Sequence, residues 1–385
     1  MKIDAVDIYH LAVPLIEPWR TAYGEDAEVE TVLVEMHSGG ESAWGESSPL
    51  AAPCYSPDWA GGVFAVLERW MAPAIVGAAI GAGEELQERL AHFKGNTFAK
   101  AALDVAWWSL EAQRQGRPLH VLINEASSAS SSVDGVVDVA VGADFGVLDS
   151  IDELLRRVGE AFDEGFPRVK LKFRPGWDVT MLRAVRERFP QQDIHIDCNA
   201  GYRMDALDTF CRLDDFQLAM IEQPLAYDDL VDHARLQAAI RTPVCLDESV
   251  RSVEAAEMAI EIEACRYINI KPGRVGGLTP AIAIHDMCRE AGVGCWVGGM
   301  LETAVGARIC LALATLEGLT YPADIFPSAR FFHEDPGDAP LETHLGQDGQ
   351  RKIATLDAPG LGCRPRPDLL EKYTKAKARI VASPS

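Results

Sequence analysis

The strongest constraint on the fold is a unit of about 25 residues that repeats from residue 137 onward. Each unit holds a short run rich in β-branched residues, then a turn, then apolar residues at helical spacing, as in 178–189 and 252–264. Strands that alternate with helices of this length predict parallel pairing, and about eight units close into a TIM-type barrel. The predicted strands are 137–143, 168–173, 193–200, 217–224, 242–249, 267–272, 292–299 and 319–326.

Five ionisable residues keep one phase within this repeat. They are Lys172, Asp197, Glu222, Asp247 and Lys271, at steps of 25, 25, 25 and 24 residues. Each lies near the end of its predicted strand, and active sites of TIM barrels form at the carboxyl ends of the strands. Equal phase predicts equal height, so we expect the five side chains to face one another across the barrel mouth.

The strand 168–173 carries two lysines on one face. Lys170 and Lys172 alternate with Val169, Leu171 and Phe173, so the two sets point to opposite sides. Taken alone, this pattern is typical of a strand whose lysines face water. The shared phase of Lys172 with the other four residues predicts instead that the lysines point into the barrel.

The three carboxylates predict a metal site. Carboxylates held close together repel one another unless a cation compensates them. Asp197, Glu222 and Asp247 offer only oxygen ligands, with no His or Cys in the matching phase. This donor set favours Mg²⁺, with Mn²⁺ as a substitute, and leaves coordination sites for water and substrate. N-cap carboxylates of the barrel helices and a structural Ca²⁺ site remain as alternatives at this stage.

The two flanking lysines predict proton transfer. A lysine near a metal and other cations can lose its proton near neutral pH and act as a general base, and Lys170 supplies such a positive charge beside Lys172. Lys172 and Lys271, on either side of the acidic trio, predict removal of the proton α to a metal-held carboxylate, through a stabilised enediolate. A Schiff-base aldolase and a metal-stabilised binding protein are the alternatives from other classes.

Charge and cysteine content exclude several kinds of partner. The formal net charge of -22 argues against nucleic acid and anionic membranes. The most apolar window, 70–83, is shorter than the roughly 20 residues of a bilayer span. The amino terminus shows no signal-peptide pattern, and the 9 scattered cysteines form no CxxC pair. We therefore expect a cytoplasmic protein with reduced thiols and a small-molecule carboxylate as its substrate.

Motifs along nearly the whole chain resemble the enolase superfamily and its muconate-lactonizing subgroup. The closest resemblance is to N-acylamino acid (N-succinylamino acid) racemases and o-succinylbenzoate synthases of menaquinone synthesis. The matching stretches are PWRTAYG, FKGNTFAKAALDVAWW, VKLKFRPGWDV, IEQPL, LDES, NIKPGRVGG and GGMLET. The pairing of a lysine base with Mg²⁺ is itself a known property of this superfamily. The alternative activities within the class are cycloisomerisation and dipeptide epimerisation, and Asp324 is a candidate for binding the amino group of a dipeptide.

The resemblance implies roles for individual residues. It makes Lys172 and Lys271 the catalytic lysines, and Asp197, Glu222 and Asp247 the metal ligands. It also implies a set of supporting and substrate-binding residues: Lys170, Glu248 and Arg274 in support, Asn199 on the substrate carboxylate, and Trp19, Leu50, Tyr55, Gly298 and Met300 as further substrate contacts. For Trp19, Leu50 and Tyr55, ordinary core packing is the competing interpretation.

The resemblance also implies the domain organisation. It predicts an α/β fold with a modified (β/α)7β TIM barrel and an α+β capping domain. The capping domain spans 1–132, the barrel 133–325, and the segment 326–385 completes the cap. Loops at 17–24 and 47–56 are expected to close over the substrate, and the family suggests a homo-oligomer, with an octamer as one candidate. One departure is Ala140, which stands where relatives tend to carry a serine in the first barrel strand.

Overall fold

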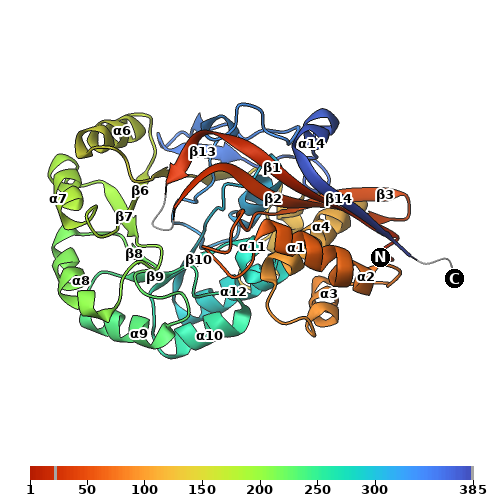
Figure 1. Cartoon of the computed structure of the whole chain (residues 1–385), viewed down its shortest axis with the longest axis horizontal. Helices are drawn as coiled ribbons and strands as arrows, with labels where there is room; N and C mark the ends of the chain where they lie inside the picture. Colours follow the sequence, from red (N-terminus) through yellow and green to blue (C-terminus); the bar gives the residue numbers. More distant parts are fainter. Residues whose placement is uncertain (21–23, 383–385) are drawn as a thin grey trace.

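The computed structural model describes residues 1–20 and 24–382, so part of the predicted loop 17–24 lies outside the described residues. Figure 1 shows a curled sheet ringed by helices on one side and a separate sheet with its own helices on the other. Among the described residues, none of the helices has the length and apolar character that crossing a membrane requires. The predicted fold class, a barrel with an α+β cap, is confirmed.

The barrel is built from seven parallel strands in the order β11-β10-β9-β8-β7-β6-β5. Its strands are β5 (Ala143–Phe145), β6 (Arg168–Lys172), β7 (Asp193–Asp197), β8 (Ile221–Glu222), β9 (Val244–Leu246), β10 (Tyr267–Ile270) and β11 (Gly294–Val297). Helices surround this sheet: α6 (Ile151–Asp163), α7 (Val179–Arg188), α8 (Leu207–Leu213), α9 (Leu230–Ala239), α10 (Val253–Glu261), α11 (Pro272–Val275), α12 (Leu278–Ala291) and α13 (Ala304–Leu313). The 3₁₀ turns η2 (Met204–Ala206) and η3 (Asp214–Phe216) flank α8, and the turn η4 (Ser328–Arg330) follows the last barrel position.

The eighth predicted strand closes the barrel without forming a regular strand. Ala323 makes an isolated parallel bridge with Val141, next to β5. The amide of the next residue, Asp324, donates to the carbonyl of Val297 in β11 at 3.0 Å. The two edges of the seven-stranded sheet are therefore joined through residues 323 and 324.

The cap is a four-stranded antiparallel sheet in the order β14-β1-β2-β3. Its strands are β1 (Ala5–Arg20), β2 (Glu25–Ser38), β3 (Glu41–Ser47) and β14 (Thr374–Val381). Its helices are α1 (Ala60–Val66), the π-helical turn η1 (Leu67–Met71), α2 (Ala72–Ile75), α3 (Gly83–Leu90), α4 (Thr97–Arg114) and α5 (Leu119–Ala126). The side chains of α4 are buried over most of its length, because this helix packs between the cap sheet and the barrel helices.

The carboxyl-terminal segment divides its contacts between the two parts. The strands β12 (His344–Leu345) and β13 (Arg351–Ala354) form a small sheet with β4 (Asp138–Ala140), which precedes the barrel. The helix α14 (Pro367–Tyr373) then leads into β14, which pairs with β1. The end of the chain thus completes the cap sheet, whereas the strands before it pack at the start of the barrel.

A buried carboxylate ties the cap to the barrel. Glu46 of β3 accepts hydrogen bonds from the amide of Thr303 at 3.0 Å and the amide of Gly306 at 2.7 Å, at the start of α13. Thr31 of β2 donates to the same carboxylate at 2.9 Å. Burial raises the pKa of Glu46 to about 7, although these hydrogen bonds act in the opposite direction. This carboxylate fixes the barrel loop that ends at Thr303.

Candidate active site

The lysine strand points its charged residues into the barrel. All five residues of β6 are buried. The side chains of Val169 and Leu171 pack in the hydrophobic core. The Nζ atom of Lys172 lies 2.6 Å from Asp197 Oδ2 on the adjacent strand β7. The interpretation in which these lysines face water is therefore excluded.

The strand register explains how the phased residues reach one mouth. Lys172 pairs with Asp197, and Asp197 pairs with Glu222. On β9 the partner of Glu222 is Cys245, so Asp247 lies two residues beyond the position that pairs with Glu222. Leu246 pairs with Ile268 on β10, so Lys271 lies two residues beyond the position level with Asp247. This stagger of four residues over four strand pairs is the average that a barrel with a shear of 8 requires. The strands are tilted relative to the barrel axis, and the stagger offsets this tilt. The five phased residues therefore lie at nearly the same height along that axis.

Lys170 lies at the centre of the buried charges. Its Nζ is 3.1 Å from Asp197 Oδ2 and 2.9 Å from Glu222 Oε2. It is also 3.1 Å from Asp324 Oδ2, on the residue that closes the barrel. Burial lowers the pKa of Lys170, but the surrounding carboxylates outweigh it and hold the pKa well above its usual value. Lys170 is thus a fixed positive charge next to Lys172.

On the opposite side, Asp247 gathers three partners. Lys271 Nζ lies 2.9 Å from Asp247 Oδ2. The hydroxyl of Tyr55 donates to Oδ1 at 2.7 Å, and Arg274 donates to the same oxygen. Burial lowers the pKa of Lys271, and Asp247 more than reverses this, so that the pKa is raised well above the usual value. Tyr55, expected as a substrate contact, therefore also orients a predicted metal ligand.

A cavity of about 50 Å³ joins the cap to these strand ends. Nine of the predicted site residues line it: Trp19, Leu50, Tyr55, Lys170, Lys172, Asp197, Asn199, Lys271 and Met300. Five predicted residues are not among its lining residues: Glu222, Asp247, Glu248, Arg274 and Gly298. The first four of these lie behind the cavity wall as buried charges. Leu50, in the loop after β3, lines the cavity with a backbone φ of 76°, in the left-handed region.

Gly298 packs against a neighbouring strand and does not line the cavity. A Cβ atom at Gly298 would lie 2.2 Å from Asn269 Oδ1, so only glycine leaves room for the Asn269 side chain. Asn269 Nδ2 in turn donates to Glu222 Oε1 at 2.8 Å. The substrate contact of Gly298 stays a prediction, and the next residue, Gly299, is the one that lines the cavity. Gly298 acts on the site through Asn269 and Glu222.

Ala140 also lies away from the cavity. It belongs to β4 and pairs with Lys352 of β13. Asp144, four residues later, is the residue of the first barrel strand that lines the cavity. Ala140 therefore lies before the barrel strand β5 rather than at its carboxyl end, and it is not among the residues that line the cavity.

Two charged residues at the site were missed from the sequence. Arg168 is fully buried and donates to Asp144 Oδ1 at 2.7 Å and also to Asp324 Oδ1. Desolvation and the charge of Asp324 raise the pKa of Asp144 to about 7. Arg168 shares the inward phase of Lys170 and Lys172, so the alternation of β6 could have indicated it. The position of Asp144 could not be read from the repeat, because the first strand carries no ionisable residue in phase with the others.

The carboxylates suit a hard divalent cation chemically. Asp197, Glu222 and Asp247 are at most 1 % exposed and supply oxygen donors from three adjacent strand ends. Burial raises the pKa of the neighbouring Glu248 well above its usual value, and the charges of Asp247 and Asp197 add to this. Within the described residues, Glu248 Oε2 and Asn199 Oδ1 are buried and accept no hydrogen bond. A concentration of negative charge with unused oxygen acceptors is the environment that a bound cation would relieve.

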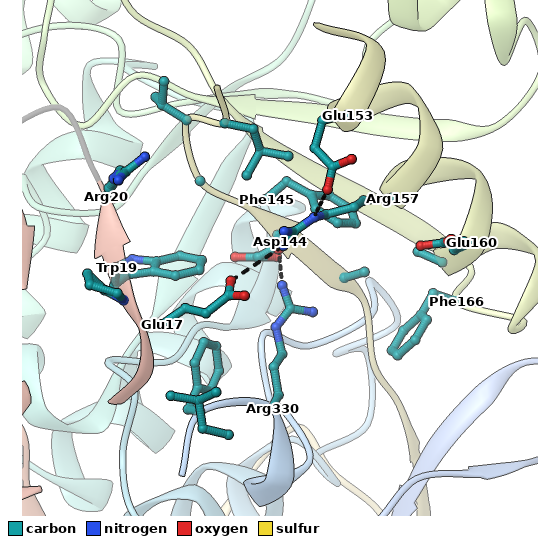
Figure 2. Close-up of a pocket in the computed structure, with 18 of the residues that line it drawn as sticks. Glu17, Trp19, Arg20, Asp144, Phe145, Glu153, Arg157, Glu160, Phe166 and Arg330 are labelled. Carbon is teal, nitrogen blue, oxygen red and sulfur yellow. Dashed lines mark hydrogen bonds and ion pairs between the residues drawn. The ribbon is translucent and has the colours of Figure 1, made fainter. Parts of the chain in front are cut away.

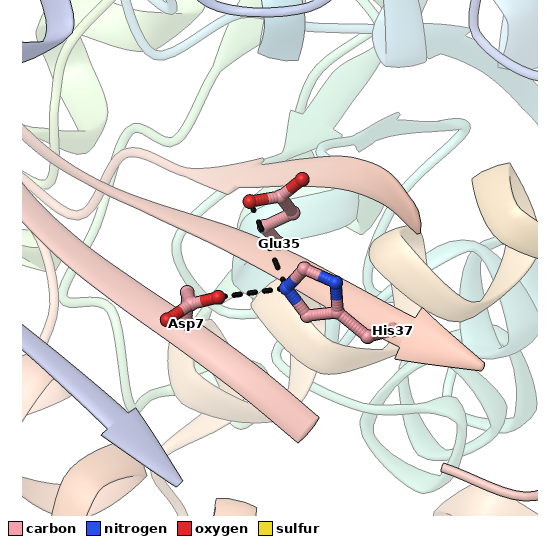
Figure 3. Close-up of side chains that lie close together, drawn as sticks. All are labelled: Asp7, Glu35 and His37. Atoms are coloured by element: carbon pink, nitrogen blue, oxygen red, sulfur yellow. Dashed lines mark hydrogen bonds and ion pairs between the residues drawn. The ribbon is translucent and has the colours of Figure 1, made fainter. Parts of the chain in front are cut away.

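A second carboxylate and imidazole cluster lies on the cap sheet (Figure 3). His37 Nε2 is 2.7 Å from Asp7 Oδ2 and 3.7 Å from Glu35 Oε2, and one ligand atom from each residue lies within 4.8 Å of the others. In the described part of the chain, no other three His, Cys, Asp or Glu residues bring ligand atoms this close together, and the predicted trio is held further apart around Lys170. Arg379 of β14 donates to Asp7 Oδ2 at 2.8 Å. We interpret this cluster as an ion-pair network that joins three cap strands.

The comparisons with known proteins agree with this geometry. Residues 4–124 match the model of the mandelate racemase/muconate lactonizing enzyme N-terminal domain, and residues 153–369 match that of the enolase C-terminal domain-like family. The chain therefore belongs to the mandelate racemase/muconate lactonizing enzyme family of the enolase superfamily, and it is an enzyme.

Relatives that are 38–39 % identical to this chain are named for two different activities. The chain is 39 % identical to an o-succinylbenzoate synthase of Geobacillus stearothermophilus, over 97 % of this chain and 96 % of the relative. It is 38 % identical to an N-succinylamino acid racemase of an Amycolatopsis species, over 99 % and 100 %. A solved enolase-superfamily structure from Listeria innocua shares 33 % identity and a TM-score of 0.91, covering 99 % of both chains.

Proposed function

We propose that the chain catalyses Mg²⁺-dependent removal of the proton α to a carboxylate, as an N-acylamino acid racemase, an o-succinylbenzoate synthase or both. The observation that carries this proposal is the arrangement of Lys172 and Lys271, which both line one small cavity from opposite sides of the acidic strand ends. Two amines on either side of a substrate carbon can take a proton from one face and deliver one to the other.

The remaining site residues have positioning roles in this proposal. Lys170 keeps a positive charge next to Lys172, and the two amines lie 3.1 Å and 2.6 Å from Asp197 Oδ2. Asn199 contacts the substrate carboxylate, and Leu50 and Met300 close the cavity from the cap and from the barrel. Arg274 holds Asp247 and Tyr55 in place, since it donates to both.

Asp197, Glu222 and Asp247 would hold the cation, with Glu248 behind them. The bound Mg²⁺, or Mn²⁺ in its place, would supply Lewis-acid stabilisation of the negative charge that develops on the substrate carboxylate. The chain itself supplies buried carboxylates that compensate the cation and a cavity that keeps bulk water from the amines.

The two activities named for the relatives begin with the same proton removal. In racemisation, Lys172 and Lys271 would exchange the roles of base and acid according to the enantiomer that is bound. In the dehydration to o-succinylbenzoate, Lys172 would act as both base and acid, and Lys271 would stabilise the intermediate by its charge. One set of residues thus serves both reactions.

Dipeptide epimerisation is disfavoured by the partners of Asp324. A free ammonium group of a dipeptide would need an available carboxylate at the eighth strand position. Asp324 Oδ2 already lies 3.1 Å from Lys170 Nζ, and Arg168 donates to its Oδ1. The carboxylate is therefore compensated, which supports an uncharged N-acyl group in preference to an ammonium group. Cycloisomerisation remains the second alternative, because it would use the same lysines.

Proton NMR in deuterated buffer tests this function directly. The protein with Mg²⁺ is incubated separately with N-acylamino acids, the o-succinylbenzoate precursor and a dipeptide. Loss of the α-proton signal of an N-acylamino acid, or formation of o-succinylbenzoate, is the expected result. Turnover of the dipeptide alone would contradict the proposal, and so would activity that survives a chelator together with a borohydride-trapped adduct.

The organisation of the protein completes the proposal. We propose a capping domain at 1–132, a barrel at 133–325 and a carboxyl-terminal segment at 326–385 that returns to the cap. We also propose a cytoplasmic homo-oligomer, with an octamer as one candidate, and sedimentation measures that assembly.

A further inference from the structure

The reaction cavity has an open side and a closed side. On the open side, a groove of about 730 Å³ lies beside it, and Trp19, Asp144 and Arg330 are among the residues that line this groove (Figure 2). On the closed side, deeper in the barrel, a buried cluster of apolar and aromatic side chains fills the interior. His195 belongs to this deeper layer, because it is fully buried and lines neither the groove nor the cavity. Its imidazole must therefore find its hydrogen-bonding partners inside the barrel.

The position of His195 follows from the alternation of β7. Ile194 and Ile196 pack in the hydrophobic core, so His195 and Asp197 share the inward face of the strand. His195 pairs in register with Lys170 on β6. Since the strands run towards the mouth of the barrel, His195 lies one step deeper than Asp197, beside the central Lys170.

Aromatic contacts hold the plane of the imidazole. Trp296 and Tyr321 pack against it edge to face, with ring centres 5.4 Å and 5.5 Å away. The hydroxyl of Tyr321 lies 2.8 Å from His195 Nδ1. A hydroxyl can donate or accept, so this contact satisfies Nδ1 in either protonation state of the ring. The second ring nitrogen, Nε2, is left to face Glu222.

Two buried polar atoms face each other at this point. Among the described residues, neither His195 Nε2 nor Glu222 Oε2 has a hydrogen-bonding partner, and the two atoms lie 3.4 Å apart. Lys170 Nζ lies 2.9 Å from the same oxygen, which favours the ionised carboxylate, so Oε2 is an acceptor. A nitrogen lone pair would be repelled by this oxygen, and Nε2 therefore carries a hydrogen. One N–H turned onto Oε2 satisfies both atoms.

The other oxygen of Glu222 is held from across the barrel. Asn269 Nδ2 of β10 donates to Oε1 at 2.8 Å. An imidazole from β7 and an amide from β10 thus address the two oxygens of one carboxylate on β8. Partners of this kind fix the orientation of a carboxylate that binds a metal, and they tune its affinity for the ion.

We propose that His195 is a positioning residue of the metal site, whose Nε2–H donates to Glu222 Oε2 and holds this carboxylate in the orientation that Mg²⁺ requires. The inference rests on the metal-binding part of the function proposed above. It gives His195 no step of proton transfer, because the imidazole does not line the reaction cavity.

Two substitutions of His195 separate the hydrogen bond from packing. His195→Met fills the space without a donor, so the Kd for Mg²⁺ of the metal-free protein should rise about 10- to 100-fold in isothermal titration calorimetry. His195→Gln restores an N–H donor and should keep the Kd within about 3-fold of the wild type. His344→Gln, which changes an exposed imidazole of β12, is the matched control and should leave the Kd unchanged. An unchanged Kd in His195→Met, or equal losses in both His195 variants, would overturn the assignment.

Nitrogen NMR locates the hydrogen in the wild-type protein. With isotope-labelled histidine, long-range proton–nitrogen correlations of the metal-free protein distinguish a protonated ring nitrogen from a bare one. The signals of His195 are those that disappear in His195→Gln. A protonated Nε2 is the expected result, and a bare Nε2 would overturn the assignment whatever the affinity for Mg²⁺.

The outcomes separate this inference from the proposed function. If the wild type binds Mg²⁺ and exchanges the α-proton of an N-acylamino acid while His195→Met keeps the wild-type Kd, only the role of His195 fails. If the Kd depends on His195 and no carboxylate substrate exchanges its α-proton, the proposed function fails and the role of His195 stands. Absence of Mg²⁺ binding to the wild type would overturn both.

Discussion

Lys172 Nζ lies 2.6 Å from Asp197 Oδ2, on residues that are direct partners in neighbouring parallel strands. A predicted base and a predicted metal ligand are thus held in one register by the backbone of β6 and β7. The same register extends to Glu222 on β8. The relative positions of these groups are therefore set by strand pairing rather than by flexible loops.

Replacing Lys172 by methionine should remove the amine and leave most of the packing intact. We expect kcat to fall by about 10²- to 10⁴-fold, the usual contribution of a positioned general base. Steady-state kinetics measures this loss. Lys372→Met, an exposed change on α14, serves as the matched control and should keep wild-type activity. A Lys172→Met variant with near wild-type kcat would contradict the role given to this lysine.

Magnesium should stabilise the folded protein by binding at the acidic strand ends. A ligand that binds only the native state adds about 2.7 kcal/mol at 100 times its Kd, so the melting temperature should rise by several degrees. Glu222→Gln should abolish most of this rise in a thermal-shift assay. Asp7→Asn, in the cluster of the cap sheet, should leave the rise intact. Loss of the rise in Asp7→Asn, with the rise retained in Glu222→Gln, would contradict this prediction and indicate that the metal binds at the cap cluster.

Glu46 should make stability depend on pH. Its pKa is about 7 in the folded protein and 4.5 as the ordinary value, so the folded state holds a proton that the unfolded state has lost between these pH values. The free energy of unfolding therefore decreases as pH rises from about 4.5 through 7, by about 3 kcal/mol from this group. Urea unfolding of Glu46→Gln should show this part of the slope missing. Glu88→Gln, at an exposed site, should keep the full slope.

Arg168 should be essential for stability. Its loss would leave Asp144 and Asp324 as buried acids with Lys170 as their remaining close cation. Removal of one partner from a buried ion pair costs about 3–5 kcal/mol, so Arg168→Met should lower the free energy of unfolding by this amount. Arg235→Met changes an exposed arginine and should cost less than about 0.5 kcal/mol. Chemical denaturation of both variants measures the difference.

The secondary structure of the barrel and the orientation of its lysine strand could be predicted from the sequence. The repeat predicted the strands that became β6 to β11, because alternating strands and amphipathic helices leave a clear period in the chain. The first predicted strand, 137–143, was misplaced, because it covers β4 and only the first residue of β5. The repeat also predicted the inward orientation of Lys170 and Lys172. The eighth strand was recognised by its position, although it forms a bridge of Ala323 with Val141 and a hydrogen bond from Asp324 to Val297 instead of a regular strand.

Long-range contacts could not be read from the pattern. Tyr55 and Asp247 are 192 residues apart, and only the docking of the cap on the barrel brings them together. The close packing of Gly298 on Asn269 depends on the stagger of the strands, which the period does not encode. Arg330 lies in a 3₁₀ turn after the last repeat, so no phase relationship marked it.

The most direct test of the proposed function is exchange of the α-proton into deuterated water in the double variant Lys172→Ala, Lys271→Ala. Proton NMR with an N-acylamino acid and Mg²⁺ follows both enantiomers in the wild type, the two single variants and the double variant. We expect exchange in the wild type, loss of racemisation in each single variant, and no exchange of either enantiomer in the double variant. Exchange that persists in the double variant would contradict proton transfer by these lysines.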